Sequence, residues 1–203
     1  MAKITNYWRL AVLISTLLLF FSIPYIHGSL NSADGYGIVS QRQASDFSLY
    51  NHHQQTVSLK DFRGRYVFLM FGFINCEDIC HSQALLFQEI HALVDYKDKP
   101  VFLYLAMDPE RDTADKLFQY FDSRGDGFYS LSARTESQMK KIAADYRAFY
   151  TFVAKDNPDQ YDINHNGFYF LIDDLGAIRY VYTAKHRDSR LIHKDLQTLI
   201  ANK

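Results

Sequence analysis

Residues 66–80 read YVFLMFGFINCEDIC, and this stretch decides the fold. Tyr66–Ile74 is a continuous apolar and aromatic run, which is typical of a central strand buried on both faces. Cys80–Tyr96 then carries apolar residues at spacings that fit an amphipathic helix: Leu85, Leu86, Ile90 and Leu93. Cys76 and Cys80 therefore follow a buried strand and precede a helix, and in an open α/β sheet ligands gather beyond the carboxyl ends of the strands.

Further strands and helices are expected on both sides of this stretch. Upstream, Phe47–Leu59 alternates apolar residues around a polar tip and predicts a hairpin. Downstream we expect strands at Val101–Met107, Phe128–Leu131 and Ala148–Val153, helices at Thr113–Phe121, Ser137–Tyr146 and Ser189–Ala201, a loop at 154–166, and a hairpin of Gly167–Asp173 with Ile178–Tyr182. This order predicts one α/β domain, a thioredoxin-like sandwich over residues 46–203.

The composition is that of one globular domain with a short appendage. The chain has 203 residues, of which 48% are apolar and 22% are charged. Its 22 basic and 23 acidic residues give a formal net charge of −1 and are spread along the chain. No basic run alternates with aromatic residues, so nucleic acid is not an expected partner.

The N-terminus predicts a membrane segment. Leu10–Ile26 carries no charge, and Lys3 and Arg9 precede it. Its length falls between a signal peptide and a spanning helix, and the positive charge before it keeps the N-terminus cytoplasmic. We expect a retained transmembrane anchor over residues 1–28 and a linker over residues 29–45, with cleavage near residues 31–33 as the alternative.

Cys76 and Cys80 are the only cysteines in the chain, and they lie four residues apart. A disulfide that closes so short a segment stabilises little, which favours a chemical role over a structural one. Positions i and i+4 of a helix lie about 6 Å apart at Cα, which permits either a disulfide or a shared metal ion. Two inert core cysteines are the remaining alternative.

The residues between the cysteines favour a metal ion over a free thiolate. A helix N-terminus lowers the pKa of a thiol, but Glu77 and Asp78 disfavour a third negative charge beside them. A cation that bridges the two sulfurs removes this conflict. We therefore interpret the loop as a metal site.

Three segments in register resemble one protein family. Phe71–Cys80 is similar to the signature FGFTxCPDxCP, Asp108–Thr113 matches DPERDT, and Asn164-His165 precedes the strand-like segment Phe168–Asp173. Together they resemble the SCO/SenC family of copper-binding assembly factors for cytochrome c oxidase. The spacing and order agree from about residue 40 to the C-terminus.

This resemblance implies that Cys76, Cys80 and His165 bind one copper ion. It implies a single-pass protein of the inner membrane whose soluble domain lies in the periplasm, or in the equivalent mitochondrial intermembrane space. The implied partners are the copper-binding subunit of the oxidase and a protein that supplies copper or reducing equivalents. Soft thiolates suit Cu(I) and imidazole suits Cu(II), so such a site can hold both states.

Three positions depart from the family pattern. The family usually has proline after each cysteine, where this chain has Glu77 and His81. Many members have aspartate where this chain has Asn164. Loss of the prolines affects the rigidity of the loop, and loss of the carboxylate removes a negative charge beside the metal. We expect an altered preference between Cu(I) and Cu(II).

Other polar residues near the motifs have simpler interpretations. His81 is a weak candidate for a further ligand, because adjacent side chains on a helix point apart. Asp108 before Pro109 is typical of a helix N-cap, with support of the metal site as the alternative. Arg111 and Asp112 are expected to form a local ion pair.

A second function stays open from the sequence. Cys76 and Cys80 could act as the redox-active pair of a thiol–disulfide reductase that works on copper-ligating cysteines of a client. General oxidoreductases of this fold carry CxxC and a cis-proline facing it. None of the four prolines (Pro24, Pro100, Pro109 and Pro158) lies beside the strand expected from Gly167. This argues against a general oxidoreductase. A peroxidase is a weaker option, because the acidic loop argues against a low cysteine pKa.

Overall fold

The computed structural model describes residues 8–9, 11–20, 35–76, 79–95, 99–155 and 161–202. The chain divides into two compact units, Met1–Asp34 and Gly35–Lys203. In the first unit, residues 11–20 are helical. No helix within the described residues has both the length and the apolar character needed to span a membrane. Residues 1–7, 10 and 21–28 of the expected anchor lie outside the described part of the chain.

The centre of the second unit is a pair of parallel strands, β4 (Val67–Gly72) and β5 (Val101–Ala106). Every residue of both strands is buried, as their continuous apolar sequences predict. β6 (Phe128–Ser132) runs parallel to β5, and β9 (Tyr169–Ile172) runs antiparallel to β4 on its other side. The carboxyl ends of β4 and β5 therefore share one edge of the sheet.

The complete sheet has eight strands in the order β1-β10-β9-β4-β5-β6-β2-β3. Its outer strands are β1 (Ile38–Gln43), β2 (Ser48–Tyr50), β3 (Thr56–Ser58) and β10 (Ala177–Tyr182). The two hairpins expected from the sequence are present, since β2 pairs with β3 and β9 pairs with β10.

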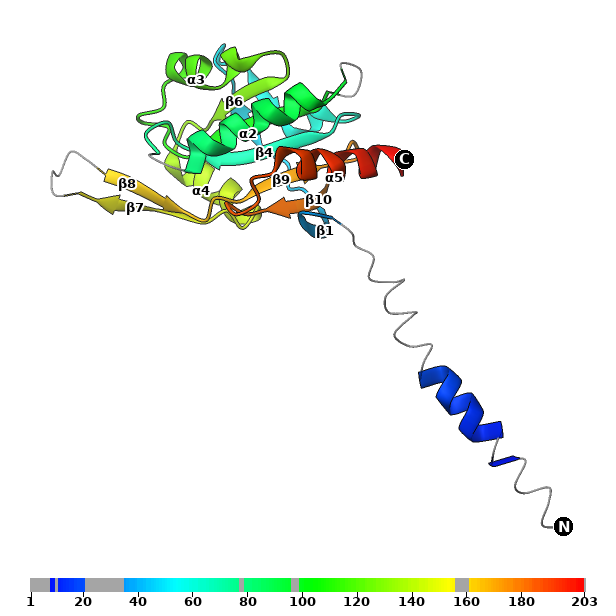
Figure 1. Ribbon diagram of the computed structural model, residues 1–203. Helices are drawn as coiled ribbons and strands as arrows, with labels where there is room; N and C mark the ends of the chain where they lie inside the picture. Colours follow the sequence, from blue (N-terminus) through cyan, green and yellow to red (C-terminus); the bar gives the residue numbers. More distant parts are fainter. Residues whose placement is uncertain are drawn as a thin grey trace. The chain divides into compact units, whose positions relative to one another are not determined.

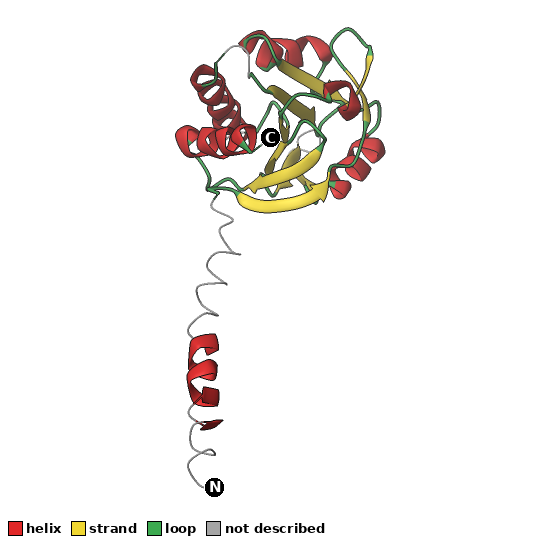
Figure 2. Cartoon of the chain, turned by 90° about the vertical axis from the view of Figure 1, so that its right-hand side faces the viewer, coloured by secondary structure: helices red, strands yellow, loops and turns green. Residues whose placement is uncertain are grey.

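Helices cover both faces of this sheet (Figures 1 and 2). They are α2 (Ile79–Leu93), α3 (Ala114–Tyr120), α4 (Glu136–Asp145) and α5 (Ser189–Ala201), with short 3₁₀ turns at Leu59–Phe62 and Asp122–Arg124. Phe68 of β4 packs on Phe87 of α2, with ring centroids 5.7 Å apart. Phe71 packs on Tyr146, which caps α4, at 5.6 Å. Residues 68 and 71 point to opposite faces of a strand, so these contacts define a sandwich of three layers.

The buried face of α2 differs in part from the expected one. Leu86 and Ile90 lie in the core, but Leu85 is 55% exposed and Leu93 is 42% exposed. The buried stripe consists of Cys80, Gln83, Ala84, Leu86, Phe87 and Ile90. A helix turns about 100° per residue, so a stripe centred on residues 80, 83, 84 and 87 places residue 85 towards solvent. A glutamine therefore lies where the sequence pattern predicted only apolar side chains.

β1 lies within residues 29–45, which we expected to be a linker. Ile38–Gln43 pairs antiparallel with β10 at the edge of the sheet, so the compact unit begins before residue 46. The strand was missed because its sequence, IVSQRQ, is mostly polar. An edge strand has one solvated side and tolerates such residues. Residues 29–34 lie outside the described part.

A second, two-stranded sheet consists of β7 (Tyr150–Ala154) and β8 (Tyr161–His165), which pair antiparallel. Figure 1 shows this ribbon projecting from the edge of the sandwich. Residues 154–166 were expected to form a loop, but their second part forms β8, and residues 156–160 lie outside the described part. His165 therefore ends a strand and faces Tyr150 across the ribbon.

Asp195 attaches α5 to the start of β1. Its side chain is 3% exposed and accepts hydrogen bonds from the backbone N–H groups of Tyr36 (2.9 Å) and Gly37 (2.9 Å). It also accepts one from the hydroxyl of Tyr182 at 2.9 Å. These bonds explain why the polar β1 segment is held against the sheet.

Asp195→Asn is expected to lower the free energy of unfolding by about 2 kcal/mol, because the amide NH₂ would face hydrogen-bond donors in a buried place. Urea unfolding of the full chain measures this. Asp188→Asn is the matched control: Asp188 is the N-cap of the same helix, and asparagine caps helices equally well. Equal stability losses in the two variants would contradict this role of Asp195.

Candidate metal centre

The structure brings the three expected ligands together. Cys76 follows β4, Cys80 is the second residue of α2, and His165 ends β8. His165 Nε2 lies 3.5 Å from Cys80 Sγ, and the ligand atoms of all three residues lie within 4.8 Å of one another. Cys76 is 7% exposed, Cys80 is fully buried and His165 is half-buried. One metal ion could bind to all three side chains at once.

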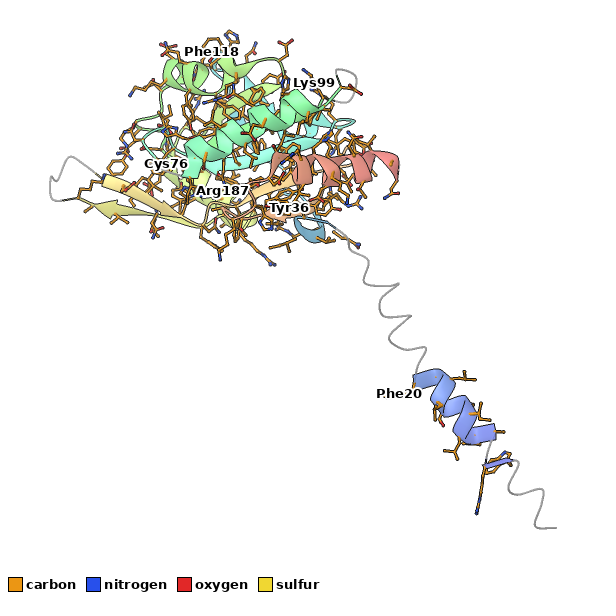
Figure 3. The ribbon with its side chains drawn as sticks, viewed as in Figure 1. Phe20, Tyr36, Cys76, Lys99, Phe118 and Arg187 are labelled. Atoms are coloured by element: carbon orange, nitrogen blue, oxygen red, sulfur yellow. The ribbon has the colours of Figure 1, made fainter. Side chains whose placement is uncertain are left out.

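The turn between β4 and α2 positions the two sulfurs. The N–H of Cys76 donates to Phe73 O (3.2 Å), which bends the chain away from the strand. The N–H of Cys80 then donates to Cys76 Sγ (3.4 Å), so the sulfur of Cys76 lies over the start of the helix. Figure 3 labels Cys76 at this end of α2. A helix N-terminus stabilises negative charge, which suits a metal-bound thiolate at Cys76.

The surroundings of Cys80 favour its protonated thiol. Its hydrogen bond with Cys76 raises the pKa of the Cys80 thiol far above its ordinary value, and burial raises the pKa further. A buried thiol of this kind is a poor free nucleophile. A cation that takes the place of the proton satisfies both sulfurs, so metal binding releases protons here. Glu77 and Asp78, whose charges we invoked from the sequence, lie outside the described residues.

The imidazole of His165 is oriented towards Cys80. Its Nδ1 accepts a hydrogen bond from the N–H of Gly167 at 3.2 Å. A neutral imidazole that accepts at Nδ1 carries its proton on Nε2, which here faces Cys80 Sγ. The ring of Phe73 lies edge-to-face against the imidazole at 6.0 Å. In the metal-free protein the ring therefore points its Nε2, the nitrogen that would bind metal, at the sulfur of Cys80.

The segment Asp108–Thr113 ties β5 to the ribbon that carries His165. Asp108 is 1% exposed, forms an ion pair with Arg111 and accepts a hydrogen bond from the hydroxyl of Tyr161 at 2.7 Å. The guanidinium of Arg111 lies 3.6 Å from the centre of the Tyr161 ring. The expected pair of Arg111 with Asp112 is thus replaced by a pair with Asp108. The N-cap of α3 is Thr113, whereas Asp108 caps the turn before that helix, where its Oδ1 accepts from the N–H of Arg111 at 3.3 Å.

Asp112 holds the bend that precedes Cys76. Its side chain is 3% exposed, and its two oxygens accept from the N–H of Ile74 at 3.3 and 3.2 Å. Burial raises the pKa of Asp112 to about 7, with the charge of Asp108 adding to this and the Ile74 hydrogen bond opposing it. Asp112 therefore titrates near neutral pH.

This shift predicts a pH-dependent stability that Asp112→Asn removes. Between about pH 4, where unfolded aspartate titrates, and pH 7, folded Asp112 keeps its proton while the unfolded chain has lost it. The free energy of unfolding therefore falls as pH rises through this window, by about 4 kcal/mol for this group, since one pKa unit corresponds to about 1.4 kcal/mol. The asparagine side chain of the variant would still accept from the N–H of Ile74 and would not titrate.

Urea unfolding of both proteins between pH 4.5 and 8 measures this difference, with exposed Asp115→Asn as the control. A constant difference in stability between the wild-type chain and Asp112→Asn across the range would contradict the shifted titration of Asp112.

An open cavity of about 500 Å³ leads to Cys76. Its lining consists of Ile74, Asn75, Cys76, His81, Arg111, Lys155, Tyr161 and Asp162. His81 faces this cavity but bonds through Nδ1 to the hydroxyl of Tyr120 (2.9 Å), and the metal-binding group does not include it. The cavity thus opens onto Cys76.

A model of the SCO1/SenC family matches residues 38–201 of the chain. The chain belongs to the SCO1/SenC family. The SCO2 homolog of mouse mitochondria is 30% identical over 159 residues, which cover 77% of this chain and 62% of that protein. A SCO2-like protein of Rickettsia prowazekii is 30% identical over 158 residues, which cover 77% of this chain and 74% of that protein.

Solved structures of SCO1/SenC proteins share the fold. Apo Sco1 of Thermus thermophilus has a TM-score of 0.72 at 24% identity, covering 81% of this chain and 95% of that one. ScoI of Bradyrhizobium japonicum, solved with copper bound, has a TM-score of 0.67 at 24% identity, covering 77% of this chain and 98% of that one. The thioredoxin-like α/β fold expected from the sequence is confirmed.

Proposed function

We propose that this SCO1/SenC protein binds one copper ion through Cys76 Sγ, Cys80 Sγ and His165 Nε2 and delivers it during assembly of the copper site of cytochrome c oxidase. The observation that carries the proposal is the convergence of these three ligand atoms within 4.8 Å. Structures of Bradyrhizobium and yeast Sco proteins contain copper, and BsSco is described as one of the Sco family of cytochrome c oxidase assembly proteins.

The donor set suits copper as a cargo. Two thiolates favour Cu(I), and the imidazole extends the site to Cu(II). Two ligands are buried, which shields the ion from water, whereas the cavity at Cys76 leaves one side accessible. A site that is shielded on one side and open on the other can hold an ion and still exchange it with a partner.

The position of the protein in the cell is part of the proposal. The apolar segment Leu10–Ile26 would anchor the chain in the inner membrane, with residues 46–203 in the periplasm or the mitochondrial intermembrane space. Its partners would be the copper-binding subunit of the oxidase and a protein that supplies copper or reducing equivalents. The named mouse relative is mitochondrial, and the chain covers 62% of its length.

Anaerobic copper titration of the reduced full chain, followed by mixing with the copper-free soluble domain of the oxidase subunit, tests the proposal. We expect one copper per chain and its transfer to the oxidase domain. Absence of stoichiometric binding would overturn the copper site. Tight binding without transfer would overturn the delivery role.

A second candidate function rests on the proximity of the two sulfurs, which lie within 4.8 Å of each other. In this reaction the Cys76 thiolate attacks a client disulfide, and Cys80 resolves the mixed disulfide. The client gains two thiols and this chain gains the Cys76–Cys80 disulfide. The raised pKa of Cys80 disfavours this role in the metal-free protein. Disulfide exchange that survives in His165→Ala, with copper binding unchanged, would favour the reductase.

A further inference from the structure

Gln83 connects the helix of one proposed ligand to the turn of another. It lies three residues after Cys80 on the buried face of α2 and is 3% exposed. Its Nε2 donates to the carbonyl of Gly167 at 2.7 Å. The N–H of the same Gly167 donates to His165 Nδ1 at 3.2 Å. A continuous series of hydrogen bonds therefore runs from α2 to the imidazole.

The Gly167 turn is also packed directly on α2. Gly167 is buried and has φ of +60°, a left-handed conformation that favours glycine. A Cβ added there would lie 3.1 Å from Cγ2 of Ile79, the first residue of α2. The turn thus has little room to move towards the helix, and the Gln83 bond opposes movement away from it.

The bond from Gln83 does not depend on where the imidazole carries its proton. When a metal binds Nε2, the neutral ring carries its proton on Nδ1 and cannot accept from the N–H of Gly167. The bond between Gln83 Nε2 and the carbonyl of Gly167 is unaffected by that change. Gln83 therefore restrains the turn in the metal-loaded protein as well, when the bond from the glycine N–H to the ring is lost.

The other end of the Gln83 amide is not satisfied. Within the described residues, Gln83 Oε1 is buried and has no hydrogen-bond partner. A buried oxygen of this kind is unfavourable for folding, and methionine would fill a similar volume without it. The stability of the core therefore does not explain a glutamine at this position. The hydrogen bond from Gln83 Nε2 to the carbonyl of Gly167 explains why a glutamine is present.

We infer that Gln83 is a positioning residue that holds His165 within bonding distance of Cys76 and Cys80, an inference that rests on the proposed copper site. Residues that orient metal ligands typically contribute 10–100-fold to metal affinity. Gln83→Met is thus expected to weaken Cu(II) binding by about 10–100-fold while both cysteines remain in place.

Gln43→Met is the matched control. Gln43 Nε2 donates to the carbonyl of another glycine, Gly176, at 2.9 Å in the turn between β9 and β10. The same type of bond is removed there without touching the metal site. The measurements are Cu(II) affinity by chelator competition and pulsed EPR of the Cu(II) form of the full chain. We expect weaker binding and loss of the imidazole nitrogen signal in Gln83→Met alone.

The experiment distinguishes a failure of this inference from a failure of the proposed copper site. If the wild-type chain binds no copper, the proposed function is overturned. If the wild-type chain binds copper through His165, but Gln83→Met and Gln43→Met show equal affinities and an intact imidazole signal, only the role of Gln83 is overturned.

Gly167→Ala tests the same connection if Gln83→Met does not fold. It adds a methyl group against Ile79 and strains the turn. Gly64→Ala is its control, because Gly64 has φ of +85° with nothing within 4 Å of the added Cβ. Weaker copper binding in Gly167→Ala alone is expected. Equal affinities in the two alanine variants would overturn the inference.

Discussion

Cys76→Ser and Cys80→Ser are each expected to weaken copper binding by two to three orders of magnitude. Zinc sites with four protein ligands bind with about 10–16 kcal/mol, which averages to roughly 3–4 kcal/mol for each ligand. At about 1.4 kcal/mol for each tenfold change, loss of one ligand gives the stated range. Hydroxyl oxygen is also a poor ligand for Cu(I), which prefers sulfur.

Chelator competition with the reduced full chain measures these affinities. Ala84→Ser is the matched control, because Ala84 is fully buried on the same helix and serine adds a buried hydroxyl without removing a ligand. Unfolding curves establish that all three serine variants fold. Copper affinities of the cysteine variants that match Ala84→Ser would show that the sulfurs do not bind copper.

His165→Ala is expected to weaken Cu(II) binding by about 100-fold and Cu(I) binding by about tenfold or less. The two thiolates alone can hold Cu(I), whereas Cu(II) prefers imidazole nitrogen, so the loss falls mainly on the oxidised ion. The same average of about 3 kcal/mol for each ligand sets the larger figure. The variant should therefore shift the copper couple towards Cu(I).

His81→Ala is the control for this variant. His81 follows Cys80 directly, but its ring bonds to Tyr120 and lies outside the metal-binding group. The measurements are the affinities for Cu(I) and Cu(II) and the reduction potential of bound copper, and they should change in His165→Ala. In His81→Ala the affinities should stay within about threefold of the wild-type values and the reduction potential within about 20 mV. Equal losses of Cu(I) and Cu(II) affinity in both histidine variants would contradict a specific role of His165.

Much of the fold follows from burial that is visible in the sequence. β4 and β5 are apolar along their whole length, and only a strand covered on both faces requires this. β1 and β8 were missed for the opposite reason. Each lies at an edge or in an isolated ribbon, where one side is solvated, so polar residues are tolerated and no apolar pattern marks the strand.

The proposed ligands were found because their chemistry and their spacing agree. Cys76 and Cys80 are soft donors four residues apart where a strand is followed by a helix, and His165 precedes a buried strand that pairs with β4. The residues that support them were not found. Gln83 is a polar residue within a helix, and Tyr161 lies in a segment expected to be a loop. Nothing in the sequence therefore distinguishes either residue from one on the solvated surface.

The segment Asp108–Thr113 was recognised as a motif, but its contacts were assigned differently. A local ion pair between neighbours is the simplest expectation for Arg111 and Asp112. The structure instead directs Arg111 to Asp108 and Tyr161, and Asp112 to the backbone of Ile74. These contacts join segments that are far apart in the sequence, and short-range patterns carry no information about such pairs.

X-ray absorption spectroscopy of the copper-loaded, reduced full chain tests the proposed site most directly. Bound Cu(I) should show two sulfur ligands and one imidazole nitrogen, and the nitrogen should disappear in His165→Ala. A spectrum without sulfur ligands, or one whose imidazole nitrogen persists in that variant, would contradict binding by Cys76, Cys80 and His165.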